Sequence, residues 1–459
     1  MLNTKQPTMI TAIIGRNASG KTQWVEQLRR RTASDRLRYI AFRDSYGPAV
    51  DGTYYLQLRW NQHDIDAEMP TAGDVLQKSY RMTGDDSPEH RADKERLLTL
   101  FNLRETLDKY IITLSSGELR KFQLVKTLLS RPQMLILDNP FIGLDAETRR
   151  QLRDLLLLLA RERGIDLYLV LAKSDDIPTY VDQVINMDDD DPTPFPFREL
   201  RQTAVPPHVL GDEKRQAILD LPYKNKEYQA DEVINMHDVS IRYGERTILK
   251  SLDWTVRNGE CWALTGQNGA GKSTLLSLVC ADNPQSYACD IALFGYQRGQ
   301  SGESIWDIKR HIGYVSPEMH RSYQRDIAAL RIVASGLKDT VGLYVKPDEQ
   351  EKEQCRWWMR IFGIEQLAER SFLQMSSGEQ RLVLLARAFV KDPELLILDE
   401  PLHGLDNTNR RLVKDIIETF CQRRNKTMIM VTHYEEELPA CITHHLHLQR
   451  ADSGKQSAL

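Results

Sequence analysis

Short apolar runs alternate with longer amphipathic stretches along most of this chain. Residues 9–14, 134–137 and 167–171 are almost wholly apolar, which is typical of strands buried on both faces. Between them, residues 89–110 carry apolar side chains at helical spacing, and a further helix is expected to end near Arg163. Buried strands that alternate with helices predict an α/β fold with a mainly parallel sheet.

The second half begins with a different pattern. Residues 233–243 and 247–256 are two strand-like stretches, and both precede a glycine-rich turn that opens at Gly266. A similar turn opens at Gly15, but too few residues stand before it to form two such strands. We therefore expect the first copy to lack these leading strands; a truncated chain start is the alternative.

An ordered set of motifs occurs twice. GRNASGKT begins at Gly15 and GQNGAGKS at Gly266, each after an apolar run and before a helical stretch. An SSGE motif follows in each half, and then an apolar strand that ends in Asp138 or Asp399 at the same separation. Such a repeat predicts two tandem P-loop domains, each a mainly parallel sheet with flanking helices and a helical subdomain.

The composition between the two motif sets indicates where the domains end. We expect a first domain at residues 1–187, a linker at 188–230 and a second domain at 231–450. The linker segment begins with four consecutive aspartates and contains six prolines. This composition is typical of an exposed connection and does not suit one long helix.

Charge and hydropathy exclude several classes of protein. The 459 residues include 61 basic and 65 acidic side chains, a net charge of −4, so no general attraction to nucleic acid or anionic lipid is expected. No apolar run approaches the roughly 20 residues of a membrane-spanning helix, and no secretory signal is recognisable. We expect a cytoplasmic protein, or one peripheral to the inner face of the cell membrane through a partner.

The six cysteines all lie in the second half, and none forms a CxxC pair. In a cytoplasmic protein they are expected to be reduced and mostly buried. The one mixed cluster along the sequence contains Cys441, His444, His445 and His447. A zinc site is an alternative there, but exposed histidines on a terminal strand are the favoured interpretation.

The glycine-rich motifs have a direct chemical meaning. In GxxxxGK[ST], backbone N–H groups surround a phosphate at a helix N-terminus, the lysine neutralises phosphate oxygens, and the hydroxyl binds Mg²⁺. The aspartate that ends the later strand supplies a second contact to the metal. The metal contacts are therefore expected from Thr22, Asp138, Ser273 and Asp399. The expected ATP contacts of the two loops are Gly15, Asn17, Gly20, Lys21, Thr22, Gly266, Asn268, Gly271, Lys272, Ser273 and Thr274.

Together with the SSGE motifs, these residues make the chain resemble the ABC ATPase superfamily over nearly its whole length. The resemblance implies that the two domains pair head to tail within one chain, with each ATP held between one phosphate loop and the other domain's SSGE motif. Ser376 and Gly378 would then cover the ATP of the first loop, and Ser115 and Gly117 that of the second. Tyr243 resembles the aromatic residue that stacks on adenine in this family.

The catalytic residues implied by the resemblance are complete only in the second half. Glu400 corresponds to the family's general base and His433 to its switch histidine, beside Lys272, whereas the first half has Asn139 and Ala172 at these places. An amide cannot accept a proton at neutral pH. We therefore expect one hydrolytic and one binding-only site; slow turnover at both sites is the alternative.

A further departure concerns the glutamine that family members carry after the strand following the phosphate loop. Ser316 and Pro317 stand at this place in the second half, and Phe42 lies near it in the first. In transporters this loop couples the nucleotide to the membrane partner. Ordinary transporter coupling is therefore in doubt.

Two stretches, residues 302–320 and 439–448, resemble the ModF-type group of tandem ABC ATPases associated with molybdate transport operons. That resemblance implies an ATPase that energises a separate permease for a metal oxyanion. The alternative is a soluble ABC machine without a permease that acts on a ribosome, nucleic acid or another protein complex. The ABC-F translation factors are of this kind, but their long helical linker does not suit the proline-rich segment here.

Overall fold

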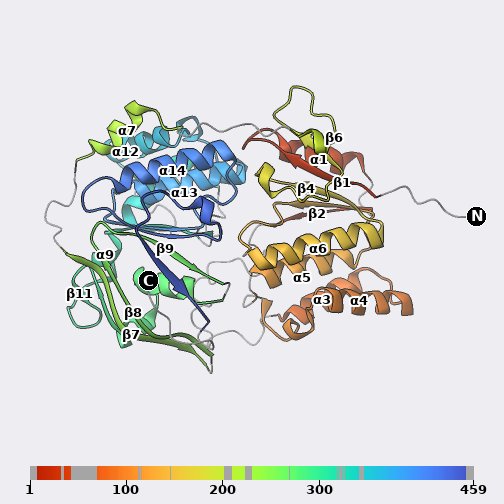
Figure 1. The fold of residues 1–459 in the computed structure, drawn as a ribbon, viewed down its shortest axis with the longest axis horizontal. Coiled ribbons are helices and arrows are strands. Elements are labelled where there is room, and N and C mark those ends of the chain that lie inside the picture. Colours follow the sequence, from red (N-terminus) through yellow and green to blue (C-terminus); the bar gives the residue numbers. More distant parts are fainter. Residues whose placement is uncertain are drawn as a thin grey trace, which may run out of the picture. The chain divides into compact units, whose positions relative to one another are not determined.

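The computed structural model describes residues 8–32, 36–42, 70–111, 114, 116–144, 146–200, 209–222, 230–244, 246–267, 269–317, 319, 323, 326–340 and 346–450. The chain forms two compact units, Met1–Ala204 and Val205–Leu459 (Figure 1). Unit 1 has one sheet and unit 2 has two, and each unit has its own hydrophobic core.

Unit 1 contains one six-stranded sheet in the order β2-β3-β4-β1-β5-β6. Its strands are β1 (Ile10–Ile14), β2 (Leu37–Ala41), β3 (Met134–Asp138), β4 (Asp166–Val170), β5 (Gln183–Asn186) and β6 (Phe195–Pro196). All neighbours are parallel except β5 and β6, so the predicted mainly parallel sheet is confirmed. The central strands are buried on both faces, in agreement with their unbroken apolar sequences.

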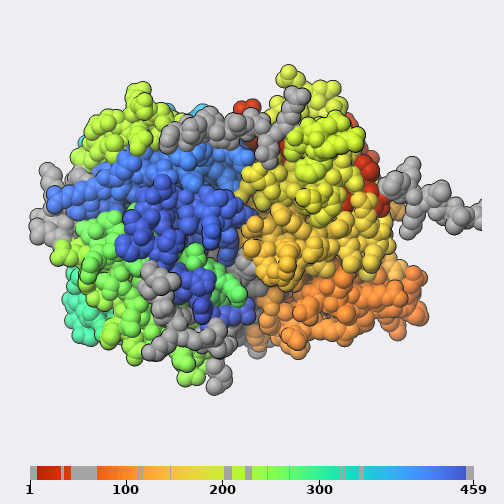
Figure 2. Space-filling view, viewed as in Figure 1, coloured from red at the N-terminus to blue at the C-terminus, as the bar shows by residue number. Residues whose placement is uncertain are grey.

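The helices of unit 1 are α1 (Lys21–Arg31), α3 (Ala72–Met82), α4 (Pro88–Leu100), α5 (Ser116–Leu128) and α6 (Ala146–Arg163), with short 3-10 turns η2 (Arg104–Thr106), η4 (Ser174–Asp176) and η5 (Phe197–Glu199). Helix α3 packs on α5, and α3 and α4 form the orange part of the surface in Figure 2. The single helix predicted over residues 89–110 is wrong beyond Leu100. Asn102 adopts a left-handed conformation with φ of 50°, which ends the helix.

Unit 2 has two sheets. The parallel one runs β12-β13-β14-β9-β15 and the second one, antiparallel, runs β11-β10-β7-β8. The strands are β7 (Glu232–Tyr243), β8 (Arg246–Arg257), β9 (Cys261–Gly266), β10 (Asp290–Leu293), β11 (Tyr296–Gln297), β12 (Ile312–Val315), β13 (Leu395–Asp399), β14 (Thr427–Val431) and β15 (His444–Leu448). The expected leading strands are thus β7 and β8. Among the described residues of unit 1, β5 and β6 are the only strands that pair antiparallel, and no counterpart of β7 and β8 is found there.

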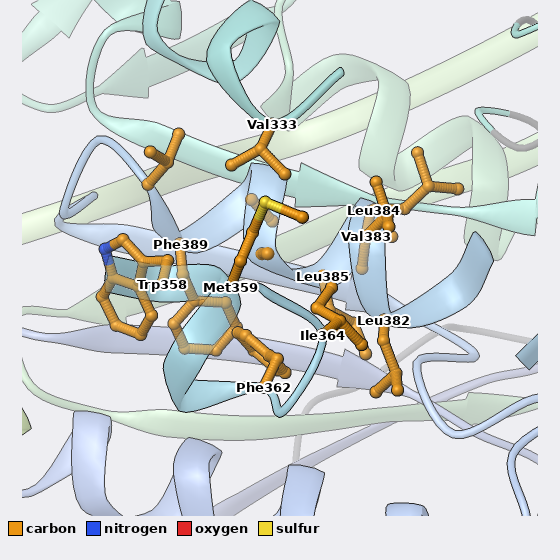
Figure 3. Close-up of a cluster of buried hydrophobic side chains, with 14 of the residues drawn as sticks. Val333, Trp358, Met359, Phe362, Ile364, Leu382, Val383, Leu384, Leu385 and Phe389 are labelled. Atoms are coloured by element: carbon orange, nitrogen blue, oxygen red, sulfur yellow. The ribbon is translucent and has the colours of Figure 1, made fainter. Parts of the chain in front are cut away.

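The helices of unit 2 are α7 (Asp212–Leu219), α8 (Lys272–Val279), α9 (Ile305–Lys309), α11 (Ala329–Ser335), α12 (Glu349–Ile361), α13 (Ser377–Phe389) and α14 (Asn407–Cys421), with 3-10 turns η6 (Pro284–Ala288), η7 (Gly336–Lys338), η8 (Glu365–Leu367), η9 (Phe372–Gln374) and η10 (Glu435–Glu437). Helices α11, α12 and α13 pack on one another. Figure 3 shows their shared core, in which Trp358 lies near Phe389 with ring centroids 5.2 Å apart. The neighbouring Trp357 is partly buried and packs against the same core.

Parts of the segment expected as a linker are attached to the units. Strand β6 pairs with β5 of unit 1, and α7 buries Ile218 completely in the core of unit 2. Asp188 lies at the beginning of the segment and accepts a hydrogen bond of 3.0 Å from the backbone N–H of Arg16. Within the part of the chain that the structure describes, no helix is long and apolar enough to cross a membrane.

Candidate nucleotide site

The two phosphate loops lie at equivalent places in their sheets. In unit 1 the loop follows β1, which lies between β4 and β5; in unit 2 it follows β9, between β14 and β15. Beyond β4 in unit 1 lies β3, which ends in Asp138, and beyond β14 in unit 2 lies β13, which ends in Asp399. Because these strands are parallel, their carboxyl ends bring both motifs to one edge of each sheet.

Glycines allow the chain to turn sharply at the start and end of each loop. Gly15 and Gly266 have φ of 145° and 142°, and Gly20 and Gly271 have φ of 91° and 97°. These values favour glycine strongly. A Cβ on Gly266 would also lie 2.4 Å from the backbone oxygen of Leu448, so any side chain there would displace β15.

Each loop lysine folds back over its own loop. Lys21 Nζ donates to the carbonyl oxygens of Gly15 and, at 2.7 Å, Arg16. Lys272 Nζ donates to the carbonyl oxygens of Gly266 at 2.6 Å and of the next residue at 3.1 Å. Both ammonium groups are thus held at the mouth of a loop, where a phosphate would need a positive charge.

The hydroxyl residues that follow the lysines differ in exposure. Thr22 and Ser273 are exposed, whereas Thr274 is buried in the first turn of α8. Asn17 is partly buried within the first loop. Its counterpart Asn268, and Ser115 of the first SSGE motif, lie outside the described residues.

Two side chains donate hydrogen bonds to the strand-ending aspartate of unit 1. Only one of these two residues, Asn139, was singled out from the sequence. Tyr39 on β2 donates its hydroxyl to Asp138 Oδ2 at 2.9 Å, and Asn139 Nδ2 donates to Asp138 Oδ1 at 2.8 Å. The residue at Tyr39's place in unit 2 is Tyr314, because each pairs with the third residue of the neighbouring strand. A tyrosine at the same register of both halves is the signal that could have identified Tyr39.

In unit 2 the residue after the strand-ending aspartate is Glu400, whose carboxyl group lies near a histidine. Glu400 is buried, and its Oε1 lies 3.7 Å from His433 Nε2. The buried Arg381 donates to the backbone oxygens of both Asp399, at 3.3 Å, and Glu400. In unit 1, Arg120 makes a similar bond of 2.6 Å to a backbone oxygen after Asp138.

The surroundings of Glu400 favour its neutral form. Burial raises the pKa of the Glu400 carboxyl well above its ordinary value, and the negative charges of Glu437 and Asp399 raise it further. Arg381 and Lys272 oppose this shift. A carboxyl group whose pKa is raised accepts a proton more readily, which is the property that a general base requires.

The SSGE motifs begin helices. Ser376 is the N-cap of α13: its hydroxyl accepts from the backbone N–H of Glu379 at 3.3 Å, and the Glu379 carboxylate accepts from the backbone N–H of Ser376 at 2.7 Å. This capping role was not predicted from the sequence, although Ser-x-x-Glu before an apolar run is its usual signature. Gly378 is buried within α13, and Gly117 is buried within α5. A Cβ on Gly117 would lie 2.9 Å from the Thr148 side chain.

Tyr243 ends β7 and is partly exposed. Asn283 Nδ2 donates to its hydroxyl at 2.9 Å, and burial raises the pKa of the phenol. The bond holds the ring in one orientation, and Asn283 is a supporting residue that the sequence analysis did not identify. Stacking of this ring on adenine stays a prediction.

The expectation for the cysteines needs a correction. All six are free thiols, but only three of them are buried. Cys441 lies with Cys261 and Cys421, and not with the histidines, of which His445 and His447 are exposed on β15. Hydrogen bonds from Cys421 and Cys441 lower the pKa of the Cys261 thiol to about 4. Sequence spacing could not reveal this trio, since its members come from three separate elements.

The comparison with known proteins agrees with the two motif sets. A family model described as "ABC transporter" matches residues 4–142 and 249–403. The Escherichia coli protein named "ABC transporter ATP-binding protein ModF" is 37% identical over 95% of this chain and 90% of its own length. An uncharacterised ABC transporter ATP-binding protein of Schizosaccharomyces pombe is 30% identical over 87% of this chain and 79% of its own length.

Solved structures with two such domains show the same fold. A model of ribosome-bound archaeal Pelota and ABCE1 matches with a TM-score of 0.58 at 17% identity, over 98% of this chain and 74% of that one. A structure named RNase-L Inhibitor matches with a TM-score of 0.52 at 17% identity, over 98% of this chain and 85% of that one. The chain therefore belongs to the ABC transporter family, and its two matching regions make it a tandem ABC ATPase.

Proposed function

We propose that this ATPase hydrolyses ATP at one site and holds ATP without rapid turnover at the other. The observation that carries the proposal is that Asn139 replaces Glu400 at the same place after the strand-ending aspartate. Phosphoryl transfer to water needs a group that orients the nucleophile and accepts its proton. A carboxylate can do both, whereas an amide can only orient.

The hydrolytic site would combine Lys272, Ser273, Asp399, Glu400 and His433. Lys272 would bind the phosphates from the loop mouth, where its ammonium group already lies. A hydroxyl and a carboxylate are oxygen ligands of the kind that Mg²⁺ prefers, so Ser273 and Asp399 fit this metal. When bound, Mg²⁺ would neutralise phosphate charge during transfer. His433, whose Nε2 lies 3.7 Å from Glu400 Oε1, would help to position Glu400 and the attacking water.

The binding-only site would use Lys21, Thr22 and Asp138 in the same roles. Tyr39 and Asn139 donate hydrogen bonds to the Asp138 carboxylate, and Asn139 is an amide where unit 2 has the carboxyl group of Glu400. Head-to-tail pairing of the units would close the second loop with Ser115 and Gly117 and the first with Ser376 and Gly378. The dipole of each following helix would then favour the nucleotide's negative charge.

ATP turnover would energise a separate membrane permease for a metal oxyanion, with this chain at the cytoplasmic face of the membrane. The support is the similarity over nearly the full length to a protein named an ABC transporter ATP-binding protein. One observation favours the second candidate, a machine without a permease that acts on a ribosome, nucleic acid or other complex. Neither Ser316 nor Phe42, after β12 and β2, can replace the glutamine that couples transporters to their partners.

The two candidates can be separated with a trapped form of the protein. Glu400→Gln should keep ATP bound at both sites and hold whatever the protein acts on. We would purify it from cells with ATP present, beside Glu349→Gln, which changes a side chain that is 90% exposed. A permease enriched only with Glu400→Gln supports the transport role. Ribosomal proteins and RNA without a permease would overturn it in favour of the second candidate.

A further inference from the structure

Three cysteines far apart in the sequence meet in unit 2. Cys261 is the first residue of β9, Cys421 is the last residue of α14, and Cys441 lies shortly before β15. Their sulfur atoms all lie within 4.8 Å of one another. Cys261 is 3% exposed, and the other two are partly buried.

A fourth sulfur adjoins the trio. Met428 on β14 is the parallel neighbour of Cys261 on β9, and its Sδ lies 4.0 Å from Cys421 Sγ. Thr443 fixes the chain near the third cysteine: its backbone N–H donates to the Cys261 carbonyl oxygen at 2.9 Å. The sulfur atoms are therefore positioned by strand pairing and a helix end, and not by flexible loops alone.

We propose that Cys261, Cys421 and Cys441 form a binding site for monovalent copper, with the Met428 thioether as a weaker fourth ligand. Thiolates and thioethers are soft ligands that suit monovalent copper, and thiolates also bind zinc. Structural zinc sites, in contrast, take four ligands from cysteine, histidine and carboxylates. The trio and Met428 together offer three thiols and a thioether. Among the described residues, the trio is the one group of three or more Cys, His, Asp or Glu side chains whose ligand atoms lie this close together.

The spacing fits one ion. A metal about 2.3 Å from three sulfurs, the length of a metal–thiolate bond, would hold the sulfurs about 4 Å apart. The three sulfur atoms lie within 4.8 Å of one another, so rotation of the cysteine side chains would be enough to reach this geometry. Three separate surface cysteines would not be expected at such distances.

This site is distinct from the nucleotide site. Cys261 and Gly266 are the first and last residues of β9. A strand rises about 3.3 Å per residue, so the two ends are separated by roughly 16 Å. Copper at the trio would not compete with Mg²⁺ at the phosphate loop, and the inference does not depend on the proposed function.

The test is a competition assay for monovalent copper, carried out in the absence of oxygen. Reduced full-length protein and a coloured copper(I) chelator, bathocuproine disulfonate, would be titrated with copper(I). We expect the wild type to retain one copper ion per chain. Changes of residues that only support a metal site commonly weaken binding by about 10- to 100-fold, so removal of two thiolate ligands in Cys421→Ser combined with Cys441→Ser should weaken retention at least about 100-fold. Met428→Leu removes the weaker ligand and should weaken it by about 10-fold. Cys289→Ser is the matched control, because Cys289 is a free thiol outside the trio.

Folding of each variant would be checked by ATP binding. If the double variant does not fold, Cys441→Ser alone replaces it, because Cys441 is partly exposed. Equal retention by the double variant and Cys289→Ser would overturn the proposal, as would complete removal of copper from the wild type by the chelator. Tighter binding of zinc(II) than copper(I) at the same cysteines would overturn the choice of metal. A disulfide within the trio that persists under reducing conditions would overturn the proposed site itself.

Discussion

Asn139 and Glu400 occupy the same backbone position in the two units. Their φ angles are 53° and 51°, and their N–H groups donate to the carbonyl oxygens of Val170 and Val431, at 2.8 and 2.9 Å. The left-handed conformation is unusual for both residue types, although asparagine tolerates it better. Since the backbone is alike, the presence or absence of a proton acceptor at this position depends on one side chain, which a single substitution can exchange.

The first prediction concerns loss of hydrolysis. Glu400→Gln should lower the steady-state ATPase rate at least about 100-fold, the usual contribution of a general base. ATP binding should persist, because the lysine and the loop glycines are unchanged. Steady-state phosphate release and equilibrium binding of labelled ATP would measure the two effects. Substantial remaining turnover would show that the first site is catalytically active.

The second prediction concerns gain of hydrolysis. In a Glu400→Gln background, Asn139→Glu should raise turnover at the first site by about 10-fold, because it supplies a proton acceptor. The gain should remain incomplete, since Ala172 stands where unit 2 has His433. Asn139→Gln in the same background is the control, as it lengthens the side chain without adding an acid. Equal rates for the two double variants would contradict the proposed role of the carboxylate.

The sequence predicted the parts of the fold in which local pattern and motif agree. The phosphate loops and strand-ending aspartates could be located because each belongs to a short, continuous segment with its own chemistry. The cysteine trio could not, because Cys261, Cys421 and Cys441 are brought together only by strand pairing and helix packing. The end of α4 was missed because one left-handed residue, Asn102, interrupts an otherwise helical pattern.

The third prediction concerns a buried ion cluster in unit 2. Asp392 accepts from Arg423, and its Oδ1 lies 3.1 Å from Lys426 Nζ; all three side chains are buried. Asp392→Ala would leave two buried positive charges without this partner and should reduce the free energy of unfolding by about 3–5 kcal/mol. Burial already lowers the pKa of Lys426, which shows that its charged form is costly there.

Hydrogen exchange of α14 and β13 would report this loss within unit 2. The control is Glu349→Ala, which removes an exposed ion pair with Lys352 and should cost less than about 1 kcal/mol. If the amides of α14 and β13 were equally protected from exchange in both variants, the buried cluster would contribute no more to stability than the surface ion pair.

The fourth prediction concerns stability as a function of pH. The raised pKa of Glu400 means that the folded protein binds this proton more tightly than the unfolded chain does. Its contribution to stability is therefore full below the ordinary pKa of 4.5 and is lost as the pH rises toward the folded value. Glu400→Gln removes the cost of ionising a buried group. The variant should be more stable than the wild type near neutral pH, and the difference should shrink in acid.

The measurement is the melting temperature of both proteins from about pH 5 to about pH 8 without nucleotide or Mg²⁺, since bound cations would change the balance. Glu349→Gln is again the control, because the side chain is 90% exposed and its replacement should give no difference that grows with pH. A gap between Glu400→Gln and the wild type that stays constant over this range would mean that the buried carboxyl does not titrate there. The same raised pKa also predicts that the ATPase rate falls as the pH is lowered, because only the ionised Glu400 can accept a proton from water.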